Sequence, residues 1–122
     1  MNYSEEEKKL FALGQERSRN GDAHGAAEIF QDLVDRRPNS AVFAATLANA
    51  LGSLGNIEKA EQYFKTAVSL APRSEKFSLG LFHYLWGQRK QLEALDEMKR
   101  FMSLSDSQDY REILSELPKS DS

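Results

Sequence analysis

Few side chains in this sequence of 122 residues have the types and spacing that catalysis or metal binding requires. His24 and His83 are the two histidines and lie far apart, and there is no cysteine to act as a nucleophile or thiolate ligand. No His-Glu-x-x-His pair, phosphate-cradling glycine loop or serine elbow occurs. Glu5, Glu6 and Glu7 are consecutive, so a helix would spread them over different faces, where they stabilise its start. We therefore expect a protein that is not an enzyme and holds no cofactor or metal.

The charge balance argues against two classes of partner. With 40% hydrophobic and 29% charged residues the chain has the composition of one small domain, and its formal net charge is -3. Such a charge suits neither nucleic acid nor an acidic membrane surface. The most apolar stretch, Leu79–Trp86, is too short to cross a bilayer. Because the first residues are acidic where a signal peptide is basic and then apolar, we expect a cytoplasmic location.

Several residue types recur along the chain at a spacing of 34 positions. A small residue is followed four positions later by a large apolar one, and in the first two units a proline comes eight positions after that. The columns are Ala26, Ala60 and Ala94; Leu13, Leu47 and Leu81; Phe30, Phe64 and Met98; and Pro38 and Pro72. Agreement between independent columns indicates an internal repeat.

The apolar spacing within each unit is helical. In the second unit one stripe of a helix contains Ala60, Tyr63, Phe64, Ala67 and Val68. Just upstream, Gly55 can end one helix in the left-handed conformation and Asn56 can cap the next. Gly87-Gln88-Arg89 provides a weaker turn in the third unit. Each repeat is therefore predicted to be a helical hairpin.

These signals predict one domain over residues 1–117, with repeats near 7–40, 41–74 and 75–108. We expect helices near 5–19, 23–36, 41–54, 57–70, 75–88 and 91–104. Ser4 and Glu7 have the spacing of a capping box, and Ser40 and Ser74 can cap the helices that follow the two prolines. A seventh, capping helix is predicted near 107–117, where it covers the apolar face of the last hairpin. A polar tail over 118–122 completes the chain.

The pattern resembles three tandem tetratricopeptide repeats followed by a capping helix. The middle unit matches that family at Leu47, Ala48, Gly55, Ala60, Phe64, Ala67 and Pro72, and the first matches at Leu13, Gly14, Ala26, Phe30 and Pro38. The first unit departs at Arg17, where a large apolar residue is usual, and the third departs at Phe82, where a small residue is usual. The resemblance implies an all-α, right-handed α-solenoid, and Phe82 predicts a wider or displaced last hairpin.

The resemblance also implies where a partner would bind. In this family the first helix of each hairpin lines a concave groove, and the matching candidate partner-binding residues are Lys8, Phe11, Gln15, Arg19, Asn49, Lys76, Leu79, His83 and Trp86. The sequence itself supports the last three, whose i, i+4 and i+7 spacing forms a second apolar stripe on the fifth helix. An apolar centre with a polar rim is typical of a binding surface.

One known use of this family, a clamp for the acidic C-termini of chaperones, does not match. At the positions that would carry the clamp, Lys76 is the one cation, and the other residues are Phe11, Gln15, Thr46 and Gly80. A free carboxylate would find too few donors there. The groove is better suited to an apolar or amphipathic segment of another protein.

Two functions remain open, ahead of a third, an enzyme or nucleic-acid-binding protein, which the residues favour least. The first is a non-catalytic interaction module, an adaptor or co-chaperone that holds a peptide or helix of a partner protein in the concave groove. The alternative is a dedicated binder of a single client, such as an immunity or inhibitor protein or a secretion chaperone. In both cases we expect a monomer or weak homodimer that binds neither nucleic acid nor membrane. Whether the concave face or another face is used stays open.

Overall fold

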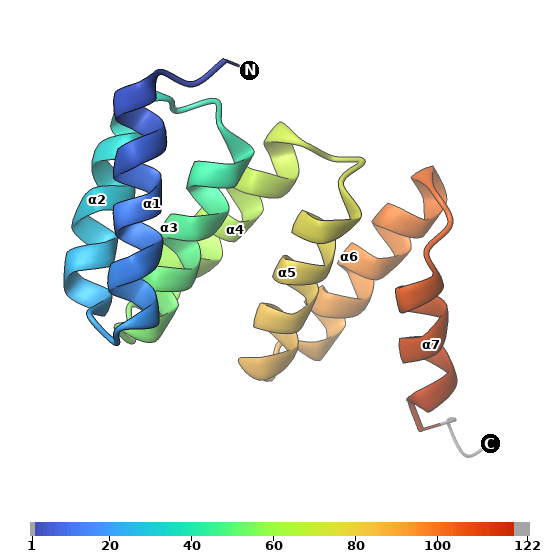
Figure 1. Cartoon of the computed structure of the whole chain (residues 1–122). Coiled ribbons are helices and arrows are strands. Elements are labelled where there is room, and N and C mark those ends of the chain that lie inside the picture. The colour runs from blue at the N-terminus through green and yellow to red at the C-terminus, as the bar shows by residue number, and fades with distance from the viewer. Residues whose placement is uncertain (1, 119–122) are drawn as a thin grey trace.

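Seven α-helices make up the computed structural model, which describes residues 2–118. They form three hairpins followed by a single helix (Figure 1). The helices are α1 (Glu5–Arg19), α2 (Ala23–Arg36), α3 (Ala41–Ser53), α4 (Ile57–Leu70), α5 (Glu75–Gly87), α6 (Gln91–Leu104) and α7 (Gln108–Glu116). No strand occurs in this range, which confirms the predicted all-α fold class. Of the polar tail expected over 118–122, residues 119–122 lie outside the described residues.

Serines begin α1, α3, α5 and α7 in the same way. The Oγ atoms of Ser4, Ser40, Ser74 and Ser107 each accept a hydrogen bond from the backbone N–H three residues later. At α1 the backbone N–H of Ser4 also donates to Glu7 Oε1 over 2.7 Å, which completes the predicted capping box. Because α7 starts like α1, α3 and α5, it occupies the place of a further first helix in the stack.

The turn inside each hairpin places one residue in the left-handed region. Gly21 has a φ of 83° and Gly55 a φ of 79°, as the sequence predicts for glycine. The third such residue is Arg89, with a φ of 62°, rather than Gly87. The third turn has a weak sequence signal because its left-handed residue is an arginine and not a glycine. A side chain is strained in this conformation. Asn56 is the N-cap residue of α4, as the sequence predicts, but its side chain makes no capping hydrogen bond.

The interior consists of two apolar clusters joined by Tyr63, which packs against both. The first cluster, from α1, α2 and α3, is centred on Phe30, Leu33 and Leu47. The second holds buried residues of α3 to α7, namely Ala48, Phe64, Val68, Leu81, Phe82, Leu85, Ala94, Met98, Phe101 and Tyr110. The repeating alanines, Ala26, Ala60 and Ala94, are all fully buried, so small side chains lie where the helices of each hairpin approach.

Leu13 departs from the other members of its column. Leu47 and Leu81 are buried, whereas Leu13 is 41% exposed. Leu47 packs with the cluster that includes α2, and Leu81 packs with residues of α4, each from the preceding hairpin. No hairpin precedes α1 in the structure, so the same position has nothing to pack against. The 34-residue repeat predicts which helix position Leu13 occupies, but it does not predict whether its side chain is buried.

The third hairpin packs less extensively than the second, and the wider or displaced arrangement expected from Phe82 stays a prediction. Gly14, Ala48 and Phe82 occupy equivalent positions, 34 residues apart, and the side chain grows along this series. A Cβ atom at Gly14 would lie 2.7 Å from the Phe30 ring, so the first hairpin requires the absence of a side chain. In the third hairpin the Phe82 ring is buried, and α5 and α6 pack against each other less extensively than α3 and α4.

The order of the hairpins leaves α1, α3, α5 and α7 on one side of the stack, with α2, α4 and α6 behind them (Figure 1). This side is the one that the sequence predicts to carry the binding groove. No helix in the described range is long and apolar enough to span a membrane.

Candidate functional site

Three hollows follow one another across the side formed by α1, α3, α5 and α7. The first lies between α1 and α3 and has a volume of about 230 Å³. The second lies between α3 and α5 and has a volume of about 410 Å³. The third, of about 230 Å³, lies between α5 and α7. We call this row the groove, and its parts the α1–α3, α3–α5 and α5–α7 hollows.

The α1–α3 hollow is lined mainly by hydrogen-bonding groups. Its residues are Gln15, Ser18, Arg19, Phe30, Thr46 and Asn49. Phe30 is buried and provides an apolar base, while the side chains of Gln15, Arg19 and Asn49 are exposed at the edges. No carboxylate is among these residues, and Arg19 forms no ion pair within residues 2–118. The hollow therefore offers hydrogen-bond donors and an uncompensated positive charge.

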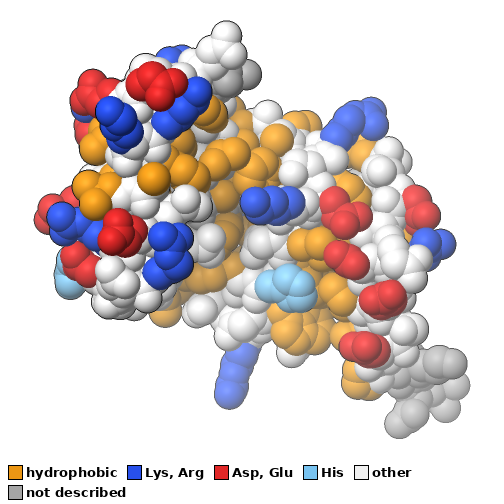
Figure 2. Space-filling model, in the orientation of Figure 1, with side chains coloured by type: hydrophobic (Ala, Val, Ile, Leu, Met, Phe, Trp, Pro, Cys, Tyr) orange, Lys and Arg blue, Asp and Glu red, His pale blue; other side chains and the backbone are white. Residues whose placement is uncertain are grey.

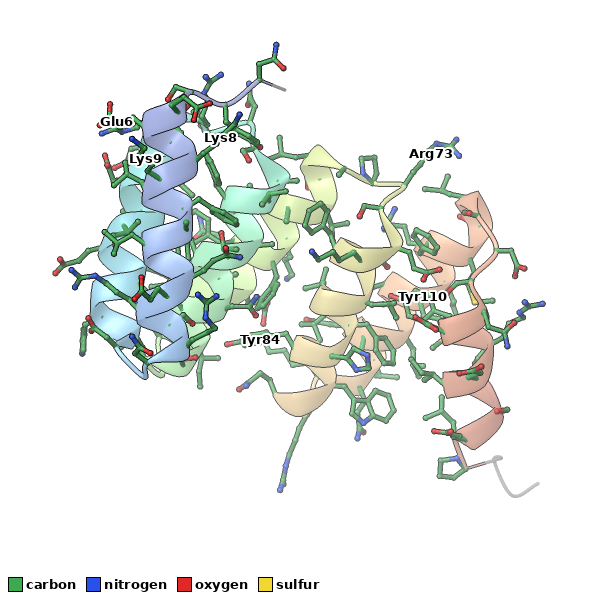
Figure 3. All side chains as sticks on the ribbon, in the orientation of Figure 1. Glu6, Lys8, Lys9, Arg73, Tyr84 and Tyr110 are labelled. Carbon is green, nitrogen blue, oxygen red and sulfur yellow. The ribbon has the colours of Figure 1, made fainter. Side chains whose placement is uncertain are left out.

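The α3–α5 hollow has an apolar base and one cation. Phe64 and Ala67 from α4 lie at its base, and its walls are Ala45, Asn49, Lys76, Phe77, Gly80, His83 and Tyr84. A Cβ atom at Gly80 would lie 3.8 Å from the Phe64 ring, so the absence of a side chain at Gly80 leaves that ring accessible. Tyr84 closes one side, because its hydroxyl donates to the Ile57 carbonyl over 3.2 Å (Figure 3). The hollow can take an apolar side chain beside the exposed Lys76 ammonium.

The α5–α7 hollow is acidic. Half-buried Leu79 and Ile113 form its apolar part, and exposed His83, Asp109, Glu112 and Glu116 surround them. None of the three carboxylates takes part in an ion pair with another residue of the described range. Figure 2 shows acidic side chains gathered at the α7 end of this face. The two ends of the groove thus differ in charge.

A buried hydrogen-bonded network that includes Tyr110, labelled in Figure 3, holds α7 in position as a wall of the groove. The Tyr110 hydroxyl lies 2.6 Å from Ser78 Oγ, which donates to Glu97 Oε2 over 2.6 Å. Since that bond uses the single Ser78 proton, Tyr110 is the donor to Ser78. Arg100 donates to both Glu97 oxygens, over 2.8 and 2.7 Å, and also to the Pro72 carbonyl. Burial raises the pKa of the Tyr110 phenol to about 12, so the network keeps its proton at neutral pH.

Six of the nine predicted partner-binding residues line the groove. Asn49 belongs to both the α1–α3 and the α3–α5 hollow, and His83 belongs to both the α3–α5 and the α5–α7 hollow. These two residues therefore mark the boundaries between neighbouring hollows. The other four are Gln15, Arg19, Lys76 and Leu79.

The remaining three predicted residues lie outside the three hollows. Half-buried Phe11 packs against the rings of Phe30 and Phe43, with centroids 5.9 and 5.7 Å apart. Trp86 is also half-buried and stacks on the Phe82 ring at 5.6 Å. Exposed Lys8 pairs with Glu5 over 3.3 Å at the start of α1. Their contribution to partner binding stays a prediction.

Sequence reasoning missed the wall that α7 contributes, because it treated this helix only as a cap. The missed residues are Asp109, Glu112, Ile113 and Glu116. A signal was present: Ile113 follows Leu79 by the repeat length and continues the column that contains Phe11 and Ala45. Extending the 34-residue spacing into α7 would have placed Ile113 in the groove.

Solved structures share this arrangement of helices at low sequence identity. The first tetratricopeptide repeat domain of Spaghetti (RPAP3), bound to the HSP90 peptide SRMEEVD, is 20% identical, with a TM-score of 0.76 over 93% of this chain and 94% of that one. The type III secretion chaperone SycD of Yersinia enterocolitica, in complex with a peptide of the translocator YopD, is 16% identical, with a TM-score of 0.76 over 93% and 87%. The Sgt2 domain from Aspergillus fumigatus is 17% identical, with a TM-score of 0.75 over 98% and 89%. At these identities the likeness shows the fold.

The family is shown by the sequence itself. No curated protein matches the chain. The family model described as tetratricopeptide repeat matches residues 19–82, which is more than half of the chain and contains the unit that fits the predicted pattern best. The helical hairpins of the structure and the 34-residue repeat of the sequence agree with that match. This chain belongs to the tetratricopeptide repeat family.

Proposed function

We propose that the chain is a non-catalytic interaction module that holds a segment of a partner protein in the groove. The observation that carries this proposal is the continuous row of three hollows from α1 to α7, each with an apolar base and exposed polar groups at its edge. Interfaces have the same composition, with an apolar centre that excludes water and a polar rim that aligns the partner. No group of side chains that could hold a metal ion occurs in the described part of the chain.

Structural relatives support a peptide as the ligand. Spaghetti is bound to an HSP90 peptide, SycD to a peptide of YopD, and the TPR2B domain of yeast Sti1 is in a complex with pHsp70. These proteins have the fold of this chain, with TM-scores of 0.73 to 0.76. A helical stack of this shape can therefore hold a peptide, which supports the proposal that the groove does so here.

The chemistry of the groove favours apolar side chains over a free carboxylate. Lys76 is the one cation among the residues of the α3–α5 hollow, where Phe64, Ala67 and Phe77 provide apolar surface. A carboxylate held by one lysine lacks the paired donors that make such contacts strong. Burial of a ligand's aliphatic or aromatic side chain on the Phe64 ring supplies more binding free energy.

A second candidate function is escort of a single client. The likeness to SycD, a secretion chaperone in complex with a peptide of the translocator YopD, favours it. The two functions differ in stoichiometry. A dedicated escort co-purifies with one client at a one-to-one ratio, whereas an adaptor co-purifies with several partners at lower ratios. Quantitative mass spectrometry of the purified complexes separates them.

Two matched variants test the groove. Gly80→Met places a flexible apolar side chain over the Phe64 ring, and the new Cβ atom makes only ordinary contacts. Ser69→Met adds the same side chain to a hollow of about 530 Å³ between α4 and α6, on the opposite side of the stack. We expect Gly80→Met to weaken binding of a co-purified partner about tenfold or more by calorimetry, and Ser69→Met to leave it unchanged. The reverse pattern would place the site on the opposite side.

A further inference from the structure

We infer that the groove selects a segment with a fixed order of side chains: a lysine or arginine in the α5–α7 hollow, an apolar residue in the α3–α5 hollow, and an aspartate or glutamate in the α1–α3 hollow. This inference rests on the proposed function, and it adds the chemistry of the ligand. The basis is the contrast between the two ends of one continuous groove, each of which carries charge that forms no ion pair within residues 2–118.

The α5–α7 hollow is built for a long basic side chain. Asp109, Glu112 and Glu116 lie three and four residues apart, so α7 presents all three carboxylates on one face, where they repel one another. Other carboxylates of the described range do form ion pairs, as Glu7 does with Arg37 at 2.8 Å. A ligand cation would relieve the repulsion at α7.

The apolar part of the same hollow matches the rest of such a side chain. The methylene groups of lysine and arginine bury readily on apolar surface while their charged ends stay among polar groups. Leu79 and Ile113 provide that surface, and the carboxylates stand at its edge. An aliphatic ligand side chain would bury against the same surface but leave the three carboxylates uncompensated. The hollow thus favours lysine or arginine over leucine.

The opposite end has the complementary chemistry. Arg19, Gln15 and Asn49 offer N–H donors around the α1–α3 hollow, and no carboxylate lines it. Lys76, at the edge of the neighbouring hollow, forms no ion pair within residues 2–118. An anionic ligand side chain at this end gains charge-assisted hydrogen bonds, whereas a cation there would face Arg19.

The geometry of packed helices sets the spacing of the ligand residues. Directly packed helices lie about 8–10 Å apart, and α1, α3, α5 and α7 contact one another only slightly, so adjacent hollows are separated by at least that distance. An extended peptide advances about 3.3 Å per residue, so side chains in adjacent hollows should be at least about three residues apart. The expected ligand has its basic and acidic residues at least about six positions apart, with an apolar residue between them.

Selection from a displayed library of random 12-residue peptides tests this order on the full chain. We expect the enriched peptides to carry the basic, apolar and acidic residues at the stated spacing and to lose binding to the Gly80→Met variant. For a synthetic copy of an enriched peptide, replacing its basic residue by alanine should weaken binding to the wild type about tenfold or more. The same replacement should have less than about a threefold effect on the double variant Glu112→Gln/Glu116→Gln.

Glu93→Gln is the matched control, because Glu93 is an exposed carboxylate of α6 on the opposite side of the stack. It should leave the tenfold effect of the basic residue intact. The double variant keeps α7 helical, since glutamine is a good helix former and Glu116 lies at the helix end where a negative charge is unfavourable.

The outcomes separate the two proposals. Peptides that require the groove but show no preference for a basic residue would overturn the inference and leave the proposed function standing. The same holds if loss of the basic residue weakens binding to the wild type and the double variant equally. Peptides that bind Gly80→Met as well as wild type would contradict the proposed function itself.

Discussion

Replacement of Tyr110 by alanine should detach α7 from the third hairpin. The Tyr110 side chain is fully buried, and its ring centroid lies 5.5 Å from that of Phe82 and 5.9 Å from that of Phe101. Truncation of a buried aromatic side chain to alanine costs about 3–5 kcal/mol, through lost burial and the cavity that remains. Because an isolated helix of nine residues is unstable in water, α7 should unfold once this contact is lost.

Tyr110→Phe separates the contribution of the ring from that of the hydroxyl. The ring contacts remain, and Ser78 Oγ still donates to Glu97 after its own donor is removed. No buried group loses its required partner, so the cost should be that of one hydrogen bond, about 1 kcal/mol. The free energies of unfolding of Tyr110→Ala and Tyr110→Phe should therefore differ by about 2–4 kcal/mol.

Urea denaturation measures both values with a built-in reporter. Trp86 is the single tryptophan and stacks on Phe82, whose ring contacts Tyr110, so its fluorescence follows the region next to α7. Far-UV circular dichroism, which follows all helices, should show lost helical signal in Tyr110→Ala before the main transition. If Tyr110→Ala costs no more than Tyr110→Phe, the buried ring does not hold α7, and the account of this helix as a fixed wall is wrong.

Three further substitutions test separate parts of the fold. Ala60→Arg puts a long charged side chain at a fully buried position, and it should destabilise the protein by about 3 kcal/mol or more; a melting temperature within about two degrees of wild type would refute this. Arg89→Gly removes a left-handed residue with a side chain and should stabilise by about 1 kcal/mol in urea, whereas Arg89→Ala should give no such gain. The hydrogen bonds from Arg37 lower the pKa of Glu7 from 4.5 to about 2, so ionised Glu7 stabilises the fold above about pH 4.5, and this stabilisation is lost towards pH 2. The melting temperature of Glu7→Gln should therefore lie below that of the wild type at pH 7 and equal it near pH 2. A difference in melting temperature that persists at pH 2 would contradict the stabilising role of ionised Glu7.

The helices could be predicted because their signals are local. The apolar stripes, the left-handed glycines and the serine caps each act within a few turns of chain, and the glycines and serines identify helix ends such as those at Ser40 and Gly55. Deviations arose where the neighbouring hairpin decides the outcome. Leu13 has the residue type and register of Leu47 but lacks a preceding hairpin, so it stays exposed.

The buried hydrogen-bonded network and the place of the α7 carboxylates in the groove could not be predicted from the residues next to them in the sequence. Glu97 follows Tyr63 by the repeat length and so lies on the packed face of α6, but this position does not predict that a carboxylate is buried there, whereas Glu93 is exposed. The burial of Glu97 follows from the approach of Ser78 and Tyr110 from two other helices. Likewise, Asp109 and Glu112 become part of the groove only because Tyr110 holds α7 beside α5.

The most direct test of the groove is a backbone amide chemical-shift titration of the 15N-labelled chain with a bound partner segment. We expect the largest shift changes on α1, α3, α5 and α7, including Asn49, Gly80 and His83, while α2, α4 and α6 change little away from Phe30, Phe64 and Ala67 at the base of the hollows. Largest changes at Ser69 and Asp96, which line the hollow between α4 and α6, would contradict this expectation.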